Sequence, residues 1–244
     1  MNIKDEINGP KGYCIIRMTD EELKQYREMI RRQWLYRIQL ACPEVAHHFF
    51  DIEIDQYHTI SDKLDHNKIW SKYTRVFLPW DIELIKSMSF MDRLRKDFGN
   101  LSFYMNTDLK REDMYWRLVR PGNQDIGPLH ADEWFFDVGN VTMPEGSTAT
   151  KVKLWISLYT NSNKNGLRVV PGSHKKIDEY KFKKVIRDGA PKPDFDEHSY
   201  DLDILHLDTT PGDVVVFNYS LLHGGIPGSD QTTRVSSEIT VLTD

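Results

Sequence analysis

Hydrophobic positions in the first hundred residues recur mostly at helical spacing. After a short apolar run at 13–18, which predicts a strand, Thr19 and Glu22 form a capping-box pattern that marks the start of a helix. The expected buried face of this helix consists of Leu23, Tyr26, Ile30 and Trp34. Pro43 predicts its end, because proline cannot continue the hydrogen-bond ladder.

Weaker periodicity follows the first helix. Residues 44–75 predict short helices and loops, and 81–98 again shows helical spacing, with Gly99 placed to cap the helix end. The first hundred residues therefore predict a mostly helical wall.

After residue 100 the pattern changes to short runs rich in aromatic and β-branched residues. The predicted strands span 101–105, 114–119, 151–159, 167–170, 214–217 and 234–241. Strict alternation in 151–159 predicts one buried and one solvated face. Helices first and strands afterwards indicate a helical wall packed on an antiparallel β sandwich or barrel.

The chain length fits one domain. We expect 1–244 to form a single unit, with 1–100 as the helical wall and 101–244 as the β core. The segment 173–203 is polar and longer than an ordinary connection, which predicts either a lid-like insertion or a solvated one.

Composition narrows the class of protein. With 39% hydrophobic residues and a net charge of −5, the chain can bury a core and is not expected to bind nucleic acid or an anionic membrane. A local basic pocket for an acidic ligand stays compatible with this charge. The N-terminus has no signal-like apolar core, and Cys14 and Cys42 indicate reduced thiols. We therefore expect a cytoplasmic protein that acts on a small molecule, while oligomeric state cannot be read from the sequence.

The candidate chemistry starts at His130-Ala131-Asp132. Residues two apart on a strand point to the same side, so this imidazole and carboxylate can reach one cavity. They would supply two of the three ligands of a 2-His-1-carboxylate metal site, which leaves coordination positions open. The third candidate is His223, which follows an apolar strand. The tripeptide alone is a weak signal.

A candidate carboxylate-binding site lies further along the chain. Arg234 and Ser236 share one face of the last predicted strand. A guanidinium fork can hold both oxygens of a carboxylate, so this pair suits the far end of a dicarboxylate ligand.

With these residues in place, the sequence resembles the phytanoyl-CoA dioxygenase-like family of iron(II)- and 2-oxoglutarate-dependent dioxygenases. The most specific segment is 165–174, Asn-Gly-Leu-Arg-Val-Val-Pro-Gly-Ser-His, which is similar to the family's NGxLxxxPGSH. Residues 12–23 are similar to its opening strand and helix, and 211–225 to the stretch that leads to its distal histidine. Arg234-Val235-Ser236 looks like its RxS.

The resemblance implies a mainly β fold with N-terminal helices, in which a double-stranded β-helix (a jelly-roll, cupin-like barrel) is buttressed by helices. It implies His130, Asp132 and His223 as iron ligands, with Arg234 and Ser236 binding 2-oxoglutarate. The implied cofactors are Fe(II), the co-substrate 2-oxoglutarate and O2.

One position departs from the family pattern. Gly225 stands where some members have a serine that helps to hold 2-oxoglutarate. Lys153, Trp155 or Tyr104 are candidates to take over that contact.

The implied reaction is hydroxylation of an unactivated C–H bond of a small molecule in the biosynthesis of a specialised metabolite, with succinate and CO2 as co-products. Asp132 argues against a halogenase, which needs a vacant position there. Desaturation, cyclisation or epimerisation at the same iron site stay open. So do a cupin-type metal-dependent isomerase that uses no 2-oxoglutarate, and a non-catalytic binding protein.

Candidate substrate residues follow from position. Trp134 shares the strand parity of His130 and Asp132 and is expected to border the substrate pocket, whereas Glu133 should face away. Arg168 is either a substrate anchor or a surface charge. Tyr104 is a further candidate. His174 is expected to brace the turn after Pro171-Gly172.

Overall fold

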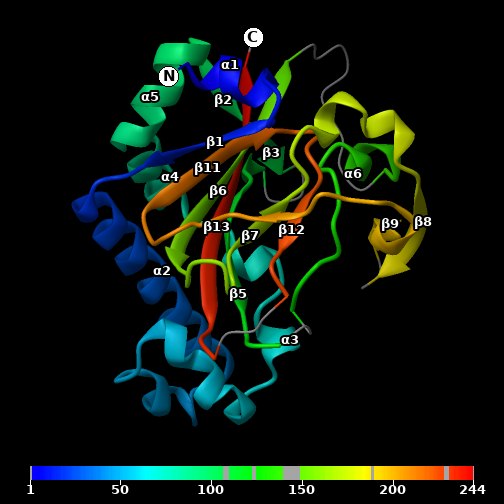
Figure 1. Ribbon diagram of the computed structural model, residues 1–244. Coiled ribbons are helices and arrows are strands. Elements are labelled where there is room, and N and C mark those ends of the chain that lie inside the picture. Colours follow the sequence, from blue (N-terminus) through cyan, green and yellow to red (C-terminus); the bar gives the residue numbers. More distant parts are fainter. Residues whose placement is uncertain are drawn as a thin grey trace.

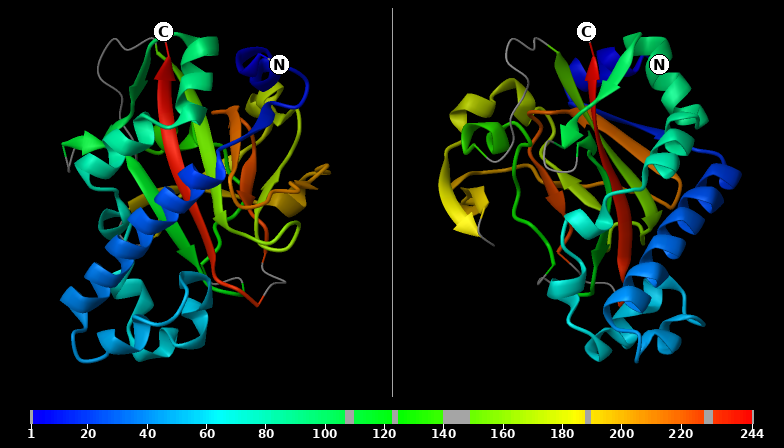
Figure 2. Two further views of the ribbon diagram at one scale, coloured as in Figure 1. Left: turned by 90° about the vertical axis from the view of Figure 1, so that its left-hand side faces the viewer. Right: turned by 180° about the vertical axis from the view of Figure 1, so that it is seen from behind.

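The computed structural model describes residues 2–106, 110–122, 125–139, 149–187, 190–227 and 231–243. Helices lie on one side of a large sheet and a smaller sheet lies on the other side (Figures 1 and 2). No helix in these ranges combines the length and apolar character needed to cross a membrane.

Most of the helical wall comes from the first hundred residues, as predicted. Its α-helices are α1 (Ile3–Asn8), α2 (Asp20–Ala41), α3 (His66–Ile69), α4 (Pro79–Lys86) and α5 (Ser89–Phe98). Short 3-10 turns fill the region between α2 and α4, at Ala46–Phe49, Ile54–Thr59, Ser61–Lys63 and Tyr73–Arg75.

The ends of α2 are those that the sequence predicts. Thr19 accepts a hydrogen bond from the Glu22 amide, and the Glu22 carboxylate accepts one from the Thr19 amide at 2.8 Å. The helix ends at Ala41, before Pro43. A capping box of this kind satisfies two backbone donors that the first turn would leave without partners.

The predicted helix over 81–98 is instead two helices, α4 and α5. The chain breaks at 87–88 because Glu22, on the neighbouring α2, binds the start of α5: its carboxylate accepts from both the amide and the hydroxyl of Ser89. Gly99 ends α5 with a φ of 78°, as its predicted capping role requires.

The main sheet holds the long strands and runs in the order β1-β11-β6-β13-β2, with β5 also paired to β13. These strands are β1 (Tyr13–Arg17), β2 (Leu101–Phe103), β5 (Met114–Val119), β6 (Thr150–Tyr159), β11 (Asp213–Asn218) and β13 (Arg234–Thr243). The strand pairs of this sheet are all antiparallel among the described residues, and a bulge shifts the β13–β6 register between Val235 and Ser236.

The smaller sheet faces the main one in the order β10-β7-β12. Its strands are β7 (Leu167–Val169), β10 (Leu205–His206) and β12 (His223–Gly225). Two sheets packed in this way form the jelly-roll barrel that the sequence predicts, and the helices buttress its outer face. A small pair, β3 (Met105–Asn106) and β4 (Arg111–Glu112), stands apart.

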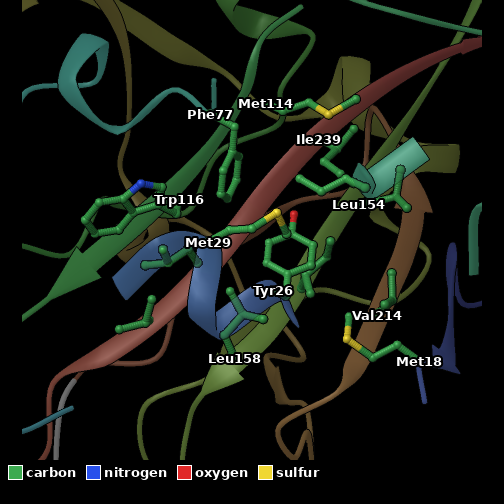
Figure 3. Packing of buried hydrophobic residues seen from close by; sticks show 14 of the residues in the cluster. Met18, Tyr26, Met29, Phe77, Met114, Trp116, Leu154, Leu158, Val214 and Ile239 are labelled. Atoms are coloured by element: carbon green, nitrogen blue, oxygen red, sulfur yellow. The ribbon is translucent and has the colours of Figure 1, made fainter. Parts of the chain in front are cut away.

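The main core lies between the helical wall and the main sheet (Figure 3). Tyr26 of α2 packs there with Leu154 of β6 and Ile239 of β13, all 0% exposed. The Tyr26 hydroxyl bonds to Ser237 Oγ at 2.9 Å, which satisfies both buried oxygens. Fully burying an apolar side chain of this size contributes about 1.5–3 kcal/mol, so this face carries much of the stability.

The prediction of a solvated face on β6 is wrong. Lys153 and Trp155, on the side opposite Leu154, are 6% and 3% exposed. The alternation is real, but the smaller sheet covers the polar face, so the charged side chains point into the barrel instead of into water.

The segment 173–203 has secondary structure of its own. It contains the hairpin of β8 (Phe182–Arg187) and β9 (Ala190–Phe195), together with 3-10 turns at Ser173–Lys175, Ile177–Glu179 and Glu197–Ser199. Tyr180 and Phe195 pack on Leu129 and Leu222, which flank the predicted metal ligands. The hairpin lies at the right of Figure 1. Its role as a lid stays a prediction.

Candidate metal centre

The backbone brings the two predicted histidine ligands side by side. His130 and His223 form an isolated antiparallel bridge, with N–H···O distances of 3.0 and 2.9 Å, and their ring centroids lie 4.5 Å apart. Each Nδ1 lies 2.9 Å from a backbone carbonyl oxygen, that of Pro128 or Leu221 respectively. We therefore place the proton on Nδ1 in both rings, which leaves each Nε2 lone pair for a metal.

Asp132 joins them by a route that differs from the prediction. The chain leaves the strand after His130 and turns: the amides of Trp134 and Phe135 donate to the carbonyls of Ala131 and Asp132, leading into α6 (Trp134–Asp137). The expectation that His130 and Asp132 share one strand is therefore wrong. The turn nevertheless directs the carboxylate toward the imidazoles.

The three side chains form one donor set. Asp132 Oδ1 lies 3.7 Å from His130 Nε2, and Oδ2 lies 3.9 Å from His223 Nε2. One ligand atom from each residue falls within 4.8 Å of the others, close enough to share one metal ion. Two imidazoles and one carboxylate leave positions free for further ligands.

Electrostatics keep His130 and Asp132 in the protonation states that a metal needs. Burial and the neighbouring His223 lower the pKa of His130 to about 4, so its imidazole is neutral at pH 7. Burial alone would raise the pKa of Asp132, but Lys153 and the two histidines lower it overall. His130 is therefore a neutral imidazole and Asp132 an ionised carboxylate. Together with His223 they form a donor set that fits a divalent cation.

Arg234 lies deeper in the barrel, 3% exposed, at the start of β13. Its Nη1 donates to the carbonyl oxygens of Asn165 and Gly166 at 3.2 and 2.8 Å. Within the described part of the chain, neither its Nε nor the Oγ of the fully buried Ser236 has a hydrogen-bond partner. Buried donors of this kind are rarely left unpaired, so both suit a bound carboxylate.

The geometry explains the glycine at 225. A Cβ added to Gly225 would lie 2.9 and 3.1 Å from the two Nη atoms of Arg234. A side chain there would therefore push the guanidinium aside, and the serine found in some family members does not fit this arrangement.

A buried charge network adjoins the triad, and the sequence reasoning missed most of it. Lys153 Nζ lies 3.2 Å from Asp132 Oδ2 and 3.5 Å from Glu238 Oε2. Glu238 also forms an ion pair with Arg117, whose Nε lies 2.7 Å from Oε1, and it accepts a hydrogen bond from the Tyr115 hydroxyl at 2.5 Å. One signal was available: Glu238 is two residues beyond Ser236 on the same strand face.

The three remaining candidates for substrate contact, Trp134, Arg168 and Tyr104, lie in different surroundings. Trp134 is buried in α6 and stacks on Phe182 of the hairpin, with ring centroids 4.7 Å apart. The strand parity assumed for Trp134 is therefore wrong, and its contact with substrate stays a prediction. Arg168 is neither a surface charge nor free, because Glu197 pairs with both its terminal nitrogens at 3.0 and 3.2 Å. Tyr104 lies beside Phe136, with ring centroids 6.5 Å apart, and its role stays a prediction.

Three other residues have structural contacts. Glu133 accepts a hydrogen bond from the Ser220 hydroxyl, away from the imidazoles. His174 packs against Gly12, where an added Cβ would come within 2.4 Å of its Nδ1. Trp155 belongs to the apolar cluster between the sheets.

Solved structures share this fold. An iron-bound EctD from S. alaskensis has a TM-score of 0.58 at 14% identity, covering 98% of this chain and 75% of that one. The non-heme monooxygenase ThoJ gives 0.56 at 14% identity, with 100% and 77% coverage. SnoK, an alpha-ketoglutarate-dependent carbocyclase from nogalamycin biosynthesis, gives 0.52 at 15% identity, with 96% and 80% coverage. A search of curated proteins finds no match.

Fold and site together define a class: jelly-roll barrels that present two histidines and one carboxylate to a single metal ion. Within that class, the family model for phytanoyl-CoA dioxygenase matches residues 10–235, so the chain belongs to the phytanoyl-CoA dioxygenase family. The family and the structural neighbours together indicate iron- and 2-oxoglutarate-dependent oxygenase chemistry.

Proposed function

We propose that the protein is an iron(II)- and 2-oxoglutarate-dependent oxygenase that hydroxylates an unactivated C–H bond of a small molecule in the cytoplasm. The observation that carries this proposal is the convergence of His130, Asp132 and His223 in a barrel that also buries Arg234, whose Nε has no hydrogen-bond partner among the residues that the structure describes. A metal site alone would suit many proteins. The buried guanidinium of Arg234 inside the same barrel favours a dicarboxylate co-substrate, because it can bind the far carboxylate.

The chain's residues then have distinct tasks. His130, Asp132 and His223 would hold the iron, and Arg234 with Ser236 would hold the far carboxylate of 2-oxoglutarate. When both are bound, the iron and co-substrate supply oxidation of a C–H bond coupled to decarboxylation to succinate and CO2. The protein positions the substrate and excludes water, which is its usual share of cofactor chemistry.

Hydroxylation is the outcome that we favour, because Asp132 fills the position that a halogenase leaves vacant. Cyclisation is a second candidate, since one structural neighbour is a carbocyclase from nogalamycin biosynthesis. The same neighbour supports a role in the biosynthesis of a specialised metabolite.

Succinate release tests the proposal. Purified protein with Fe(II), ascorbate and 2-oxoglutarate should release succinate above background, and a true substrate should raise the rate. Asp132→Asn and Arg234→Gln should abolish the release, whereas Arg187→Gln in the hairpin should not. Metal-dependent turnover of a substrate without 2-oxoglutarate would favour a cupin-type isomerase. Ligand binding with no turnover at all would favour a binding protein.

A further inference from the structure

A cavity of about 220 Å³ lies between α6 and the segment 173–203, and none of the three predicted metal ligands lines it. Its volume is below the roughly 300–1,000 Å³ of sites for drug-sized ligands, so it suits a smaller molecule. One side is formed by the start of α6, and the other by the 3-10 turn at Ile177–Glu179 and the beginning of β8. The lining residues are Glu133, Trp134, Asp137, Ile177, Asp178, Tyr180, Lys181 and Phe182.

The lining carries more negative than positive charge. It contains the carboxylates of Glu133, Asp137 and Asp178, and none of the three forms an ion pair with a basic side chain of the described residues. Lys181 also lines the cavity, but its Nζ donates to the backbone carbonyl of Asp178 at 2.7 Å. The nearby Lys176 places its Nζ over an aromatic ring instead of beside a carboxylate. The cavity therefore favours a cationic ligand.

Two buried polar groups distinguish this cavity from an ordinary acidic patch. Trp134 is 2% exposed and Tyr180 is 7% exposed, and both line the cavity. Among the described residues, neither the Trp134 indole N–H nor the Tyr180 hydroxyl forms a hydrogen bond, and neither atom is fully enclosed. The two groups therefore reach open space through the cavity. Buried polar groups are rarely left without partners, and an indole N–H can only donate, so a ligand there needs an acceptor.

Both aromatic side chains are held in place by their neighbours. The Trp134 ring stacks on Phe182, with centroids 4.7 Å apart. The Tyr180 ring meets Phe195 and Tyr200 edge-on, at centroid distances of 6.0 and 5.3 Å. Their polar atoms are thus positioned before a ligand arrives, which lowers the entropy cost of binding.

We propose that this cavity binds a small organic cation of the amino-alcohol class. The ammonium group of the ligand binds the carboxylates of Asp137 and Asp178. Its hydroxyl oxygen accepts a hydrogen bond from the Trp134 indole N–H, and the Tyr180 hydroxyl donates or accepts according to the ligand's pose. A bare metal ion does not fit, because it offers no acceptor to the indole. This site is separate from the metal centre and does not depend on the proposed function.

Three probes of equal size test the proposal. In 3-aminopropan-1-ol both groups are present, whereas 1,3-propanediol lacks the charge and n-butylamine lacks the acceptor. The readout is the indole N–H signals of the full chain in a two-dimensional NMR spectrum with ¹⁵N-labelled tryptophan, in which Trp134→Phe identifies the Trp134 signal. The amino alcohol should shift this signal saturably. It should bind about fivefold more tightly than the diol or the alkylamine, the size expected of a partly exposed ion pair or of one neutral hydrogen bond.

A pair of matched double variants locates the binding charge. Asp137 and Asp178 are exposed, so Asp137→Asn with Asp178→Asn should leave the fold intact. This variant should remove the preference for the amino alcohol over the diol. Asp51→Asn with Asp62→Asn makes the same change of charge on exposed carboxylates of the helical wall and should leave the preference unchanged.

Three results would overturn the site: equal binding of the three probes, a preference that survives the Asp137 and Asp178 changes, or shifts that leave the Trp134 signal unmoved. If Trp134→Phe does not fold, the signals that do move still report the preference, and the two double variants decide.

The titrations are run on the metal-free protein and again after loading with Zn(II). The preference for the amino alcohol should be the same in both. A preference confined to the Zn(II) form would indicate coordination of the amine to the metal and would overturn the cavity site. Failure to take up Zn(II) would count against the proposed function alone, because the metal-free titrations still test the cavity.

Discussion

The two faces of β13 differ more than any two neighbouring surfaces described above. Val235, Ile239 and Val241 face the helical wall and are at most 1% exposed in an apolar core. Arg234 and Ser236 alternate with them and are also buried, and the side chain of Glu238 is only 12% exposed, yet all three are polar or charged. Burial alone therefore does not distinguish the stabilising face from the functional one; the polarity of the buried groups does.

The neighbouring strand β6 repeats the contrast. Leu154 and Ile156 enter the apolar core, whereas Lys153 points into the barrel, where it lies near Asp132 and near Glu238 of the adjacent strand β13. Buried charge of this kind costs stability unless it is paired, so its presence indicates a site. Changes on the barrel face should therefore alter ligand binding, and changes on the core face should alter stability.

Asp132→Asn should have the largest effect on binding. It keeps the shape of the side chain but removes the only carboxylate of the triad, and we expect Co(II) affinity to fall more than about a hundredfold, since even outer-shell changes cost roughly 10–100-fold. Titration of the visible Co(II) spectrum measures this. A variant that still binds Co(II) as tightly as the parent would show that the triad is not the metal site.

Leu154→Ala is the matching change on the core face. Leu154 is 0% exposed, and its loss leaves a cavity in tightly packed surroundings. The free energy of unfolding should fall by about 2–5 kcal/mol in urea titrations. Co(II) affinity of the folded protein should stay within about twofold. A large loss of Co(II) affinity without a loss of stability would contradict the division between the faces.

The parts that could be predicted from sequence are those with local causes. The capping box at Thr19, the stop before Pro43 and the glycine cap at Gly99 depend on residues a few positions apart. The three candidate metal ligands were chosen from motif spacing and do lie together, although the reasoning about a common strand was wrong. A turn after Ala131 and a strand cannot be distinguished by a tripeptide alone.

What could not be predicted depends on which elements face each other. The alternation in β6 indicated two faces but not the second sheet that covers the polar one. Arg168 could not be paired with Glu197, because the fold of the hairpin segment was not visible in its polar composition. Arg117 and Glu238 form an ion pair only because β5 pairs with β13.

His66 offers a third kind of buried polar group, one that is kept neutral. It is 9% exposed, and its Nδ1 lies 3.0 Å from the Tyr57 hydroxyl, which itself accepts from Trp70 Nε1 at 3.2 Å. The Tyr57 hydroxyl therefore donates to Nδ1, which holds the imidazole unprotonated. Burial lowers the pKa of His66 from 6.5 to about 4, against the opposing effect of Asp125.

Stability should therefore depend on pH in a defined window. Between about pH 6.5 and pH 4 the unfolded chain binds a proton that the folded protein does not, so the free energy of unfolding should fall as the pH falls. The loss should reach about 2–3 kcal/mol and be absent above that window. Urea titrations at several pH values measure it. His66→Gln should make the slope shallower without removing it, because the pKa of His130 is lowered to about 4 as well. An unchanged slope would assign the dependence to groups other than His66.

Gly225→Ala should have the smallest effect and the most local one. Its Cβ would lie 2.9 Å from a nitrogen of the Arg234 guanidinium. We therefore expect the affinity for N-oxalylglycine, an unreactive analogue of 2-oxoglutarate, to fall about tenfold. A loss of this size is expected when one charge-assisted hydrogen bond is disturbed. Gly224→Ala on the same strand is the control, because its nearest contact would be an ordinary 3.4 Å. Equal losses in both variants would indicate a general disturbance of β12 instead of a displaced Arg234.

The central claim is that one barrel holds an iron ion and a 2-oxoglutarate molecule together, on His130, Asp132, His223 and Arg234. Anaerobic addition of 2-oxoglutarate to the Fe(II)-loaded protein tests it most directly, through the visible charge-transfer absorption that a 2-oxo acid chelated to Fe(II) produces. We predict a saturable band that requires both additions, disappears in Asp132→Asn and needs far more 2-oxoglutarate in Arg234→Gln. A folded protein that binds Fe(II) but never develops this band, or develops it equally well in Arg234→Gln, would contradict the account.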